Sequence, residues 1–418
     1  MRKRIYVLVA VVLAISILVP TIGCQPQEAV EKGKEPVKIG FALATTGPFS
    51  YDGLLEAQAL AIAVERINNA GGILGGRMVE GVVRDHGYVT ENAVTAVNKL
   101  IFDDKVDAII GLEDTALIWA AEDIMHQAQV PYVEFGGNPP GWPEAADVGA
   151  FRIGFVMDQL VSGYFTYWVE KGVTSMVVAA PDTTFIVDSY SEVFVPFAEQ
   201  YGIELFPLIT YPVGTPDFLP QLAKGAAYDA DLFLGVNFFN SEIPREMMGM
   251  QELGVPLYAK LFDIPTEETI VQVVDAAEGV IIPSMTAFVY DDNPVMTDFR
   301  EAYAAKTGLP APHYWTSNAW MAFHALVYGM EAAGVTGKGD LAAIDAGIKA
   351  ASWRNLQGDP VQWTENGAIV YKNVILAQIQ GGKFVKIGTI PAGPAPPDIY
   401  GKVLPPGTTD VGAKFPGE

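Results

Sequence analysis

The feature that most constrains this chain is a regular alternation of short apolar segments with segments of helical periodicity, starting at residue 37. Residues 37–43 are apolar enough for a buried strand, and residues 45–48 (TTGP) interrupt it. From Leu54 onward, apolar residues recur at helical spacing until Gly71-Gly72 ends the predicted helix. Short strands that alternate with helices indicate an α/β fold with a mainly parallel sheet covered on both faces.

The alternation continues through two series of segments, which predicts two α/β lobes. In the first series we expect strands at 79–85, 106–110 and 132–135, and helices at 92–102 and 115–127. In the second series we expect strands at 175–180, 204–211, 232–236, 257–261 and 280–283, and helices at 189–201, 218–225 and 242–253. Open sheets bind ligands beyond the carboxyl ends of their strands. The loops expected there are 45–51, 111–115, 135–142, 181–186, 237–241 and 262–265.

The N-terminal residues have the features of an export signal. A basic start at residues 2–4 precedes an apolar run at residues 5–19, and Cys24 is the only cysteine. Residues 21–24 (TIGC) resemble a bacterial lipobox, in which the cysteine is lipidated and becomes the first mature residue, although Thr21 stands where Leu is usual. The alternative is an uncleaved anchor, because residues 5–22 almost reach the length that spans a bilayer. Both interpretations predict an extracytoplasmic protein held at the cell membrane.

Length and charge narrow the class of protein further. Removing residues 1–23 leaves 395 residues (418 − 23), which suits two packed domains. The formal net charge is −23 and becomes −26 when Arg2, Lys3 and Arg4 are removed. So much negative charge makes nucleic acid an unexpected partner and indicates a solvated surface.

The sequence offers little support for catalysis. The four histidines lack metal-ligand spacing, and the Glu122-Asp123 pair near His126 is typical of a solvated helix face. The chain has no Gly-x-Ser-x-Gly, Walker or Gly-x-Gly-x-x-Gly pattern. We therefore predict a protein that is not an enzyme and has no metal or cofactor.

Four motifs resemble one family of binding proteins. They are residues 37–40 (VKIG), 46–48 (TGP), 63–73 (AVERINNAGGI) and 105–111 (KVDAIIG). The resemblance is to the branched-chain amino acid (Leu/Ile/Val) binding proteins of ABC importers in their lipoprotein form, and the motif order extends from about residue 37 to residue 390.

The resemblance implies a type I periplasmic binding fold, with two Rossmann-like lobes joined by three crossovers. After a signal peptide at 1–23 and a tether at 24–36, lobe 1 is expected at 37–155 and 285–360 and lobe 2 at 156–284 and 361–390. The Pro- and Gly-rich residues 391–418 suit either a strap or a disordered tail, and Tyr400 and Phe415 are candidates to pin a strap to a lobe.

The implied function is capture of an amino acid, or a related small amine or amide, in a cleft between the lobes. Closure on the solute then allows productive docking on an ABC permease, which is a population shift driven by tighter binding to the closed state. An alternative is a ligand-sensing lipoprotein that acts through a signalling partner.

The resemblance also implies ligand contacts from the loops of lobe 1. These are Leu112, Glu113, Asp114, Phe135, Gly136, Gly137 and Asn138. Asp114 stands where the family favours Ser and is alternatively a helix N-cap. Asn138 replaces the usual Thr, and Gly136-Gly137 is alternatively a plain turn.

From lobe 2 the resemblance implies that Phe185 and Phe238 cover the ligand and that Asp263 receives its ammonium group. The two phenylalanines are alternatively lobe core, and Asp263 is alternatively a turn residue before Ile264-Pro265. Tyr51, a further candidate ligand contact, and Trp142 add candidate aromatic surface at the rim. With Glu113 and Asp114, Asp263 would make the site acidic, so a cationic or amide-bearing ligand is expected beside Leu, Ile or Val.

Overall fold

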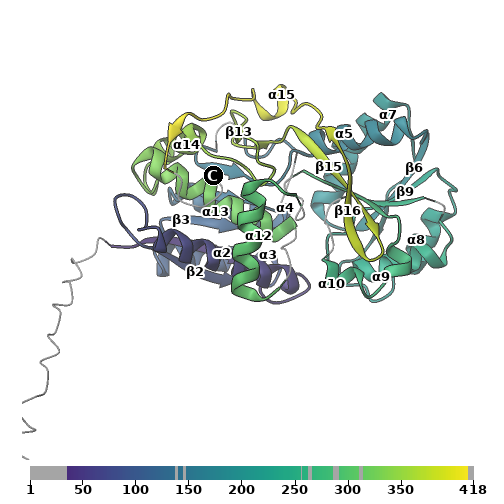
Figure 1. Cartoon of the computed structure of the whole chain (residues 1–418), viewed down its shortest axis with the longest axis horizontal. Helices are drawn as coiled ribbons and strands as arrows, with labels where there is room; N and C mark the ends of the chain where they lie inside the picture. The colour runs from purple at the N-terminus through teal and green to yellow at the C-terminus, as the bar shows by residue number, and fades with distance from the viewer. Residues whose placement is uncertain are drawn as a thin grey trace, which may run out of the picture. The chain divides into compact units, whose positions relative to one another are not determined.

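The computed structural model describes residues 35–136, 140–144, 147–255, 257–261, 266–285, 291–309 and 314–412. The chain from Pro36 onward forms one compact unit that contains two large β-sheets (Figure 1). The predicted signal peptide, Cys24 and most of the tether lie outside the described residues. Among the helices that are described, none has the length and apolarity needed to span a membrane.

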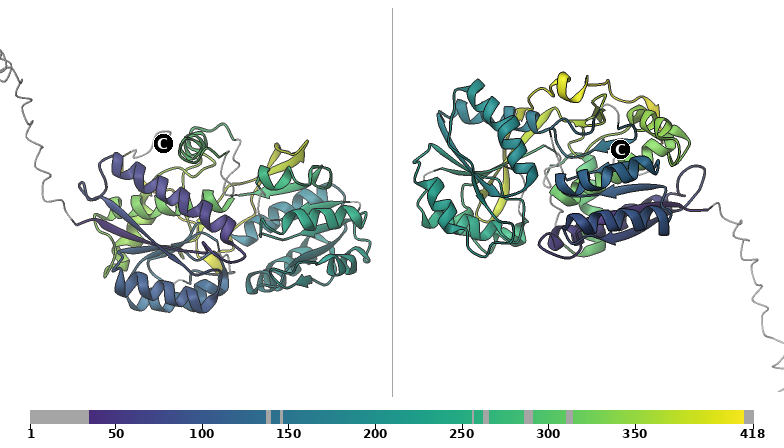
Figure 2. Two further views of the ribbon diagram at one scale, coloured as in Figure 1. Left: turned by 90° about the horizontal axis from the view of Figure 1, so that it is seen from below. Right: turned by 180° about the vertical axis from the view of Figure 1, so that it is seen from behind.

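The first sheet is fully parallel and has the order β2-β1-β3-β4-β5. Its strands are β1 (Val37–Leu43), β2 (Val79–Asp85), β3 (Ala108–Gly111), β4 (Tyr132–Glu134) and β5 (Ala150–Arg152). Its helices are α2 (Ser50–Asn69), α3 (Thr90–Asn98), α4 (Thr115–Gln127), α12 (Pro294–Thr307), α13 (Tyr314–Ala333) and α14 (Leu341–Ala350). Figure 2 shows α2 on one face of the sheet and α3 and α4 on the other. This sheet and its helices are lobe 1.

The second sheet has the order β16-β15-β11-β10-β9-β6-β7, with β8 also paired to β6. Its strands are β6 (Ser175–Pro181), β7 (Glu204–Leu205), β8 (Ile209–Tyr211), β9 (Leu232–Gly235), β10 (Tyr258–Lys260), β11 (Ile281–Ser284), β15 (Asn373–Gln380) and β16 (Lys383–Pro391). The pairs β11–β15 and β15–β16 are antiparallel and the others are parallel. Its helices are α5 (Met157–Glu170), α6 (Thr184–Ser189), α7 (Val195–Tyr201), α8 (Leu219–Ala226), α9 (Ile243–Glu252), α10 (Glu267–Ile270) and α11 (Val274–Ala277). Together they are lobe 2.

These elements confirm the predicted fold class of two α/β lobes with parallel sheets. The strand at 79–85 and the helix at 115–127 have the predicted bounds. The single strand expected at 204–211 is instead two short strands, because Pro207 lies between them and has no N–H for the ladder. The helix expected at 189–201 begins at Thr184 and contains a π-helical turn at Tyr190–Phe194.

The chain returns to lobe 2 later than the expected crossover at Val361. β13 (Gln362–Trp363) and β14 (Ile369–Val370) form a hairpin, and Ala368 of this hairpin bridges to Arg152 of β5. The chain re-enters the second sheet at Asn373, where β15 begins. The β13–β14 hairpin therefore lies against lobe 1, while the main chain of Tyr371 bonds to the Gln159 side chain of α5.

The Pro- and Gly-rich C-terminal segment runs as a strap through residue 412 and contacts helix α5 of lobe 2 as well as lobe 1. It contains α15 (Pro397–Tyr400) and β17 (Thr409–Asp410), which pairs with β12 (Ala351–Ser352). Tyr400 is fully buried, and its hydroxyl donates to Asp158 Oδ2 at 2.8 Å. Tyr400 thus pins the strap, whereas Phe415 lies outside the described residues.

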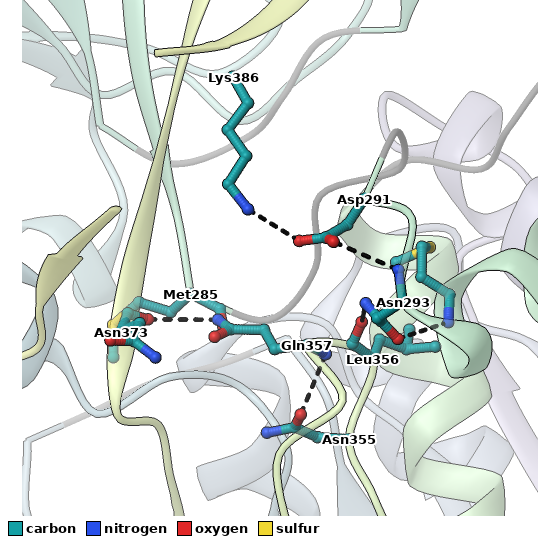
Figure 3. A network of polar contacts seen from close by, with 9 residues as sticks. Met285, Asp291, Asn293, Asn355, Leu356, Gln357, Asn373 and Lys386 are labelled. Atoms are coloured by element: carbon teal, nitrogen blue, oxygen red, sulfur yellow. Dashed lines mark hydrogen bonds and ion pairs between the residues drawn. The ribbon is translucent and has the colours of Figure 1, made fainter. Parts of the chain in front are cut away.

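A polar network joins the segments that pass between the lobes (Figure 3). The Gln357 side-chain amide donates to the main-chain oxygen of Met285, after β11, and to that of Asn373 at 3.2 Å. Asn293 Nδ2 donates to Leu356 O at 3.0 Å, and Lys386 of β16 pairs with Asp291 at 3.0 Å. We call Met285, Asp291, Asn293, Asn355, Leu356, Gln357, Asn373 and Lys386 the hinge network.

Candidate functional site

Glu113 ties together three loops at the carboxyl end of the first sheet. Its Oε1 accepts from the main-chain N–H of Ala44 at 2.8 Å, and its Oε2 lies 2.8 Å from His86 Nε2. Both side chains of this ion pair are fully buried. Burial alone would lower the pKa of His86, but the Glu113 charge and hydrogen bond outweigh it and raise that pKa. Glu113 therefore has two partners within lobe 1, and its contact with a ligand stays a prediction.

Asp114 is the N-cap of α4. Its Oδ1 accepts from the Ala116 N–H at 2.9 Å, and its Oδ2 accepts from the Tyr88 hydroxyl at 3.0 Å. Burial raises the pKa of this carboxyl group. Leu112, just before the acidic pair, is buried with φ of 68°. The capping interpretation is confirmed. Contact of Asp114 with a ligand stays a prediction.

The loop after β4 packs closely against the same loops. Phe135 is fully buried, and its oxygen accepts from Asn318 Nδ2 at 2.9 Å. A Cβ atom on Gly136 would lie 2.6 Å from both Glu113 Cα and Trp315 Cζ3. Glycine is therefore required at 136 by the close approach of two other segments. Gly137 and Asn138, predicted beside it, lie outside the described residues.

Aromatic side chains from both lobes meet at this edge. Phe49 stacks on Tyr88 with ring centroids 5.4 Å apart, and both rings meet Phe239 of lobe 2 edge-on, at 6.0 and 5.5 Å. Trp315 of α13 meets Phe49 at 5.1 Å and Phe238 of lobe 2 at 6.4 Å. We call Phe49, Tyr88, Phe185, Phe238, Phe239 and Trp315 the interlobe aromatic cluster.

The two predicted phenylalanines belong to this cluster. Phe185 contacts Phe238 with centroids 6.3 Å apart, and Phe238 also contacts Phe239 at 4.7 Å. Both are buried, at 6% and 3% exposed. Phe238 therefore contacts Trp315 of lobe 1, and Phe185 packs beside Phe238, while the contact of either ring with a ligand stays a prediction.

Polar contacts cross between the lobes beside the aromatic cluster. Asn240 Nδ2 of lobe 2 donates to Asp52 Oδ1 of α2 at 2.8 Å, and both side chains are buried. Burial raises the Asp52 pKa to about 7. The Tyr51 hydroxyl lies 3.1 Å from Thr266 Oγ1 and 3.4 Å from Glu268 Oε2. Tyr51 thus makes an interlobe contact at the predicted rim, and Asp263, predicted nearby, lies outside the described residues.

Sequence reasoning missed several residues that meet here. Phe49 and Asn240 lie within the loops that were expected at the carboxyl ends of strands, so their positions carried a usable signal. Asp52 is in the first turn of a helix, and Tyr88 and Trp315 come from segments whose proximity depends on tertiary packing. In the part of the chain that is described, no group of His, Cys, Asp or Glu could hold a metal ion.

The chain matches the family model of the periplasmic binding proteins over residues 36–383. It is 34% identical over 294 residues to Leu/Ile/Val-binding protein homolog 8 of Brucella melitensis biotype 1, which covers 65% of this chain and 70% of the relative. It is 31% identical over 124 residues to Leu/Ile/Val-binding protein homolog 7 of Brucella suis biovar 1, covering 30% of this chain and 29% of the relative. The chain thus spans less than a third of that second relative's length.

A solved structure supports the fold independently. The solute binding protein of an ABC transporter from R. palustris, crystallised with benzoate, superposes with a TM-score of 0.76 at 21% identity and covers 88% of this chain and 99% of that protein. The family model spans most of the chain, and its members bind ligands without catalysing a reaction. The chain therefore belongs to the periplasmic binding protein family, in the group of the Leu/Ile/Val-binding proteins, and is not an enzyme.

Proposed function

We propose that this protein captures an amino acid, or a related small amine or amide, between its two lobes and delivers it to an ABC importer. The observation that carries the proposal is the meeting of loops from both sheets through Asp52–Asn240 and the interlobe aromatic cluster. Ligands of open α/β sheets bind beyond the carboxyl ends of the strands, where these loops lie. Contacts that form only when the lobes meet stabilise the closed state, which a ligand must favour to shift the population.

The side chains near these loops favour a ligand that donates hydrogen bonds. Asp114 stands at the position where the resemblance implies contact with a ligand carboxylate, and an ionised Asp would repel that group. Asp263 is the proposed partner of an ammonium group. Flanking rings provide apolar and cation–π surface. The proposed class therefore includes cationic and amide-bearing solutes beside Leu, Ile and Val, which the names of the relatives mention.

A thermal-shift screen tests the proposal directly. Purified protein is heated with amino acids, amines, amides and urea, and we expect at least one compound to raise the melting temperature with saturable dependence on its concentration. Calorimetry on Asp114→Asn, which keeps the helix cap, should then show at least about tenfold weaker binding of that compound, because one charge-assisted hydrogen bond is lost. The charge-matched control is the exposed Asp229→Asn on lobe 2.

Two results would contradict the capture proposal. One is an absence of stabilisation by every compound class. The other is a small-angle scattering profile that stays unchanged when a confirmed tight binder is added, since lobe closure changes the distribution of interatomic distances.

We also propose that the protein is exported and lipid-anchored at Cys24. The basic start, the apolar run and the TIGC motif support this, and two acyl chains would hold the protein firmly on a membrane. Mass spectrometry of membrane-extracted protein should find a mature chain that begins with a lipid-modified Cys24. The Cys24→Ser variant should lose the modification, and a full-length chain starting at Met1 in the membrane fraction would favour the uncleaved anchor instead.

A further inference from the structure

One loop of lobe 2 carries three side chains that contact lobe 1. It is the segment 236–242 between β9 and α9, and it is neither helix nor strand. Its consecutive residues Phe238, Phe239 and Asn240 make the contacts with lobe 1 that are described above. We call this segment the contact loop. Because it lacks the hydrogen bonds of a helix or a ladder, its polar groups need other partners to keep one conformation.

Asn237, at the start of the contact loop, bonds to the loop at two points. Its Oδ1 accepts from the Phe239 N–H at 2.9 Å, and its Nδ2 donates to Glu242 Oε2 at 3.2 Å. The side chain is fully buried. An Asn side chain that accepts from the N–H two residues further on forms an Asx turn. Asn237 therefore joins the start of the contact loop to its end.

Glu242, at the end of the contact loop, is a buried carboxylate that does not cap its own helix. It occupies the N-cap position of α9, but its side chain makes no cap hydrogen bond. Its Oε1 accepts instead from the Gly214 N–H at 2.8 Å, in the loop after β8. Its main-chain N–H donates to Phe239 O at 2.8 Å. Glu242 thus ties the contact loop to a neighbouring loop of the same lobe.

The burial of Glu242 is unfavourable for its charged form. Burial raises the pKa of this carboxyl group, although the hydrogen bonds from Gly214 and Asn237 act in the opposite direction. A buried polar group is costly unless it is hydrogen-bonded, and here both carboxylate oxygens accept bonds from loop residues. An apolar side chain would fill the same space without this cost. The carboxylate therefore indicates a need for one defined loop conformation.

We propose that Asn237 and Glu242 are positioning residues, which hold the contact loop in the conformation that meets lobe 1. Phe238, Phe239 and Asn240 then reach lobe 1 without a further loss of loop entropy when the lobes close. This role rests on the lobe closure of the proposed function. It is measurable without a ligand, so a failed ligand screen and a failed loop test are separate results.

Distances between spin labels on the two lobes test this role in the ligand-free full chain. Cys24→Ser removes the only cysteine. Glu91→Cys on α3 and Glu192→Cys in the π-helical turn after α6 then provide one exposed labelling site on each lobe. The parent should show a short-distance population, in which the lobes touch. Asn237→Ala should raise the ratio of longer to shorter distances about threefold or more, which corresponds to the net loss of about one hydrogen bond.

An exchange of the two side-chain groups separates positioning from a general loss of stability. Asn237→Asp alone places two carboxylates together, and Glu242→Gln alone places two amides together, so each should raise the same ratio. Both changes together keep every bond. The new carboxylate accepts from the Phe239 N–H and from the new amide, whose oxygen accepts from the Gly214 N–H. The double variant should therefore return the ratio to within about twofold of the parent.

Tyr164→Phe is the matched control for a buried hydrogen bond elsewhere in lobe 2. The Tyr164 hydroxyl donates to Lys260 O of β10 at 3.0 Å, with Ile281 O of β11 at 3.2 Å. Its loss should lower the melting temperature without changing the ratio of distances. The proposal is overturned if Asn237→Ala leaves the ratio unchanged or changes it no more than Tyr164→Phe does. It is also overturned if the double variant stays as open as its single variants, or if the parent has no short-distance population.

Discussion

The two regions that connect the lobes use opposite chemistry. In the hinge network, side-chain amides of Gln357 and Asn293 donate to main-chain oxygens of other segments, and an exposed Lys386–Asp291 pair adds charge. In the interlobe aromatic cluster, rings from the two lobes touch face to edge, and one buried hydrogen bond, Asn240 to Asp52, lies beside them. The hinge is thus tied by directional bonds to the backbone and the facing loops mostly by apolar contact.

This difference explains how one chain can keep its two lobes attached to each other and still allow them to separate. Hydrogen bonds to main-chain oxygens fix the crossing strands relative to one another, so small rotations can occur around a defined axis. Apolar contacts have no preferred direction and are lost as a group when the faces separate. The aromatic contacts therefore supply most of the free energy that opposes opening. The hinge network sets the axis about which the lobes rotate.

The largest expected effect comes from Phe239→Ala. Phe239 is fully buried and contacts Phe49 and Tyr88 of the other lobe. Its removal should lower the free energy of unfolding by about 3–5 kcal/mol, from lost burial plus a cavity. Urea denaturation followed by circular dichroism measures this. Phe102→Ala is the control, because that ring is 61% exposed, and it should change stability by less than about 0.5 kcal/mol.

The next effect concerns the buried hydrogen bond beside the rings. The Asp52 pKa is about 7 in the folded chain and 3.8 in the reference state. Between these two pH values the folded chain keeps a proton on Asp52 that the unfolded chain has lost. Stability should therefore fall as pH rises from about 4 to about 7, by at most about 4 kcal/mol from this group. Asp52→Asn, which keeps an acceptor for Asn240, should remove that slope and stabilise the chain at pH 8. Denaturation curves at pH 5 and pH 8 check it, and an unchanged slope would contradict the assignment.

These results also show which parts of the site a sequence can predict. The resemblance to the binding-protein family implied Leu112, Glu113, Asp114 and Phe238 as site residues, and the structure places them after β3 and β9, at strand ends where such folds bind ligands. The pairing of Glu113 with His86 was missed. His86 was judged only for metal-ligand spacing, whereas its role depends on a loop that a neighbouring strand brings alongside.

The missed aromatic residues have a different cause. Tyr88 and Trp315 come from a loop and from helix α13, and nothing local distinguishes them from core residues, whereas Phe49 and Phe239 lie in loops that were expected at strand ends. Elements were predicted well because periodicity is a local property. The position of the crossover near Asn373 was not predicted, because it depends on the bridge from Ala368 to β5, which is a tertiary contact.

A smaller effect is expected in the hinge network from Gln357→Ala. This change leaves the main-chain oxygens of Met285 and Asn373 without their amide donor. We expect a loss of about 1–3 kcal/mol in the free energy of unfolding, the usual range for unsatisfied polar groups, and less where water reaches them. Gln272→Ala, in the exposed turn after α10 and with a local hydrogen bond to Glu268 O, is the matched control.

The smallest expected effect is that of Lys386→Ala at the edge of the same network. Lys386 and Asp291 lie 3.0 Å apart, but their side chains are 40% and 22% exposed. Water and salt screen such a pair, so its loss should change the free energy of unfolding by about 0–1 kcal/mol, and less at high salt. Denaturation at two salt concentrations measures both values. A loss as large as that of Gln357→Ala, persisting in high salt, would show that charge and not backbone hydrogen bonding holds the hinge, which would reverse the comparison between the two regions.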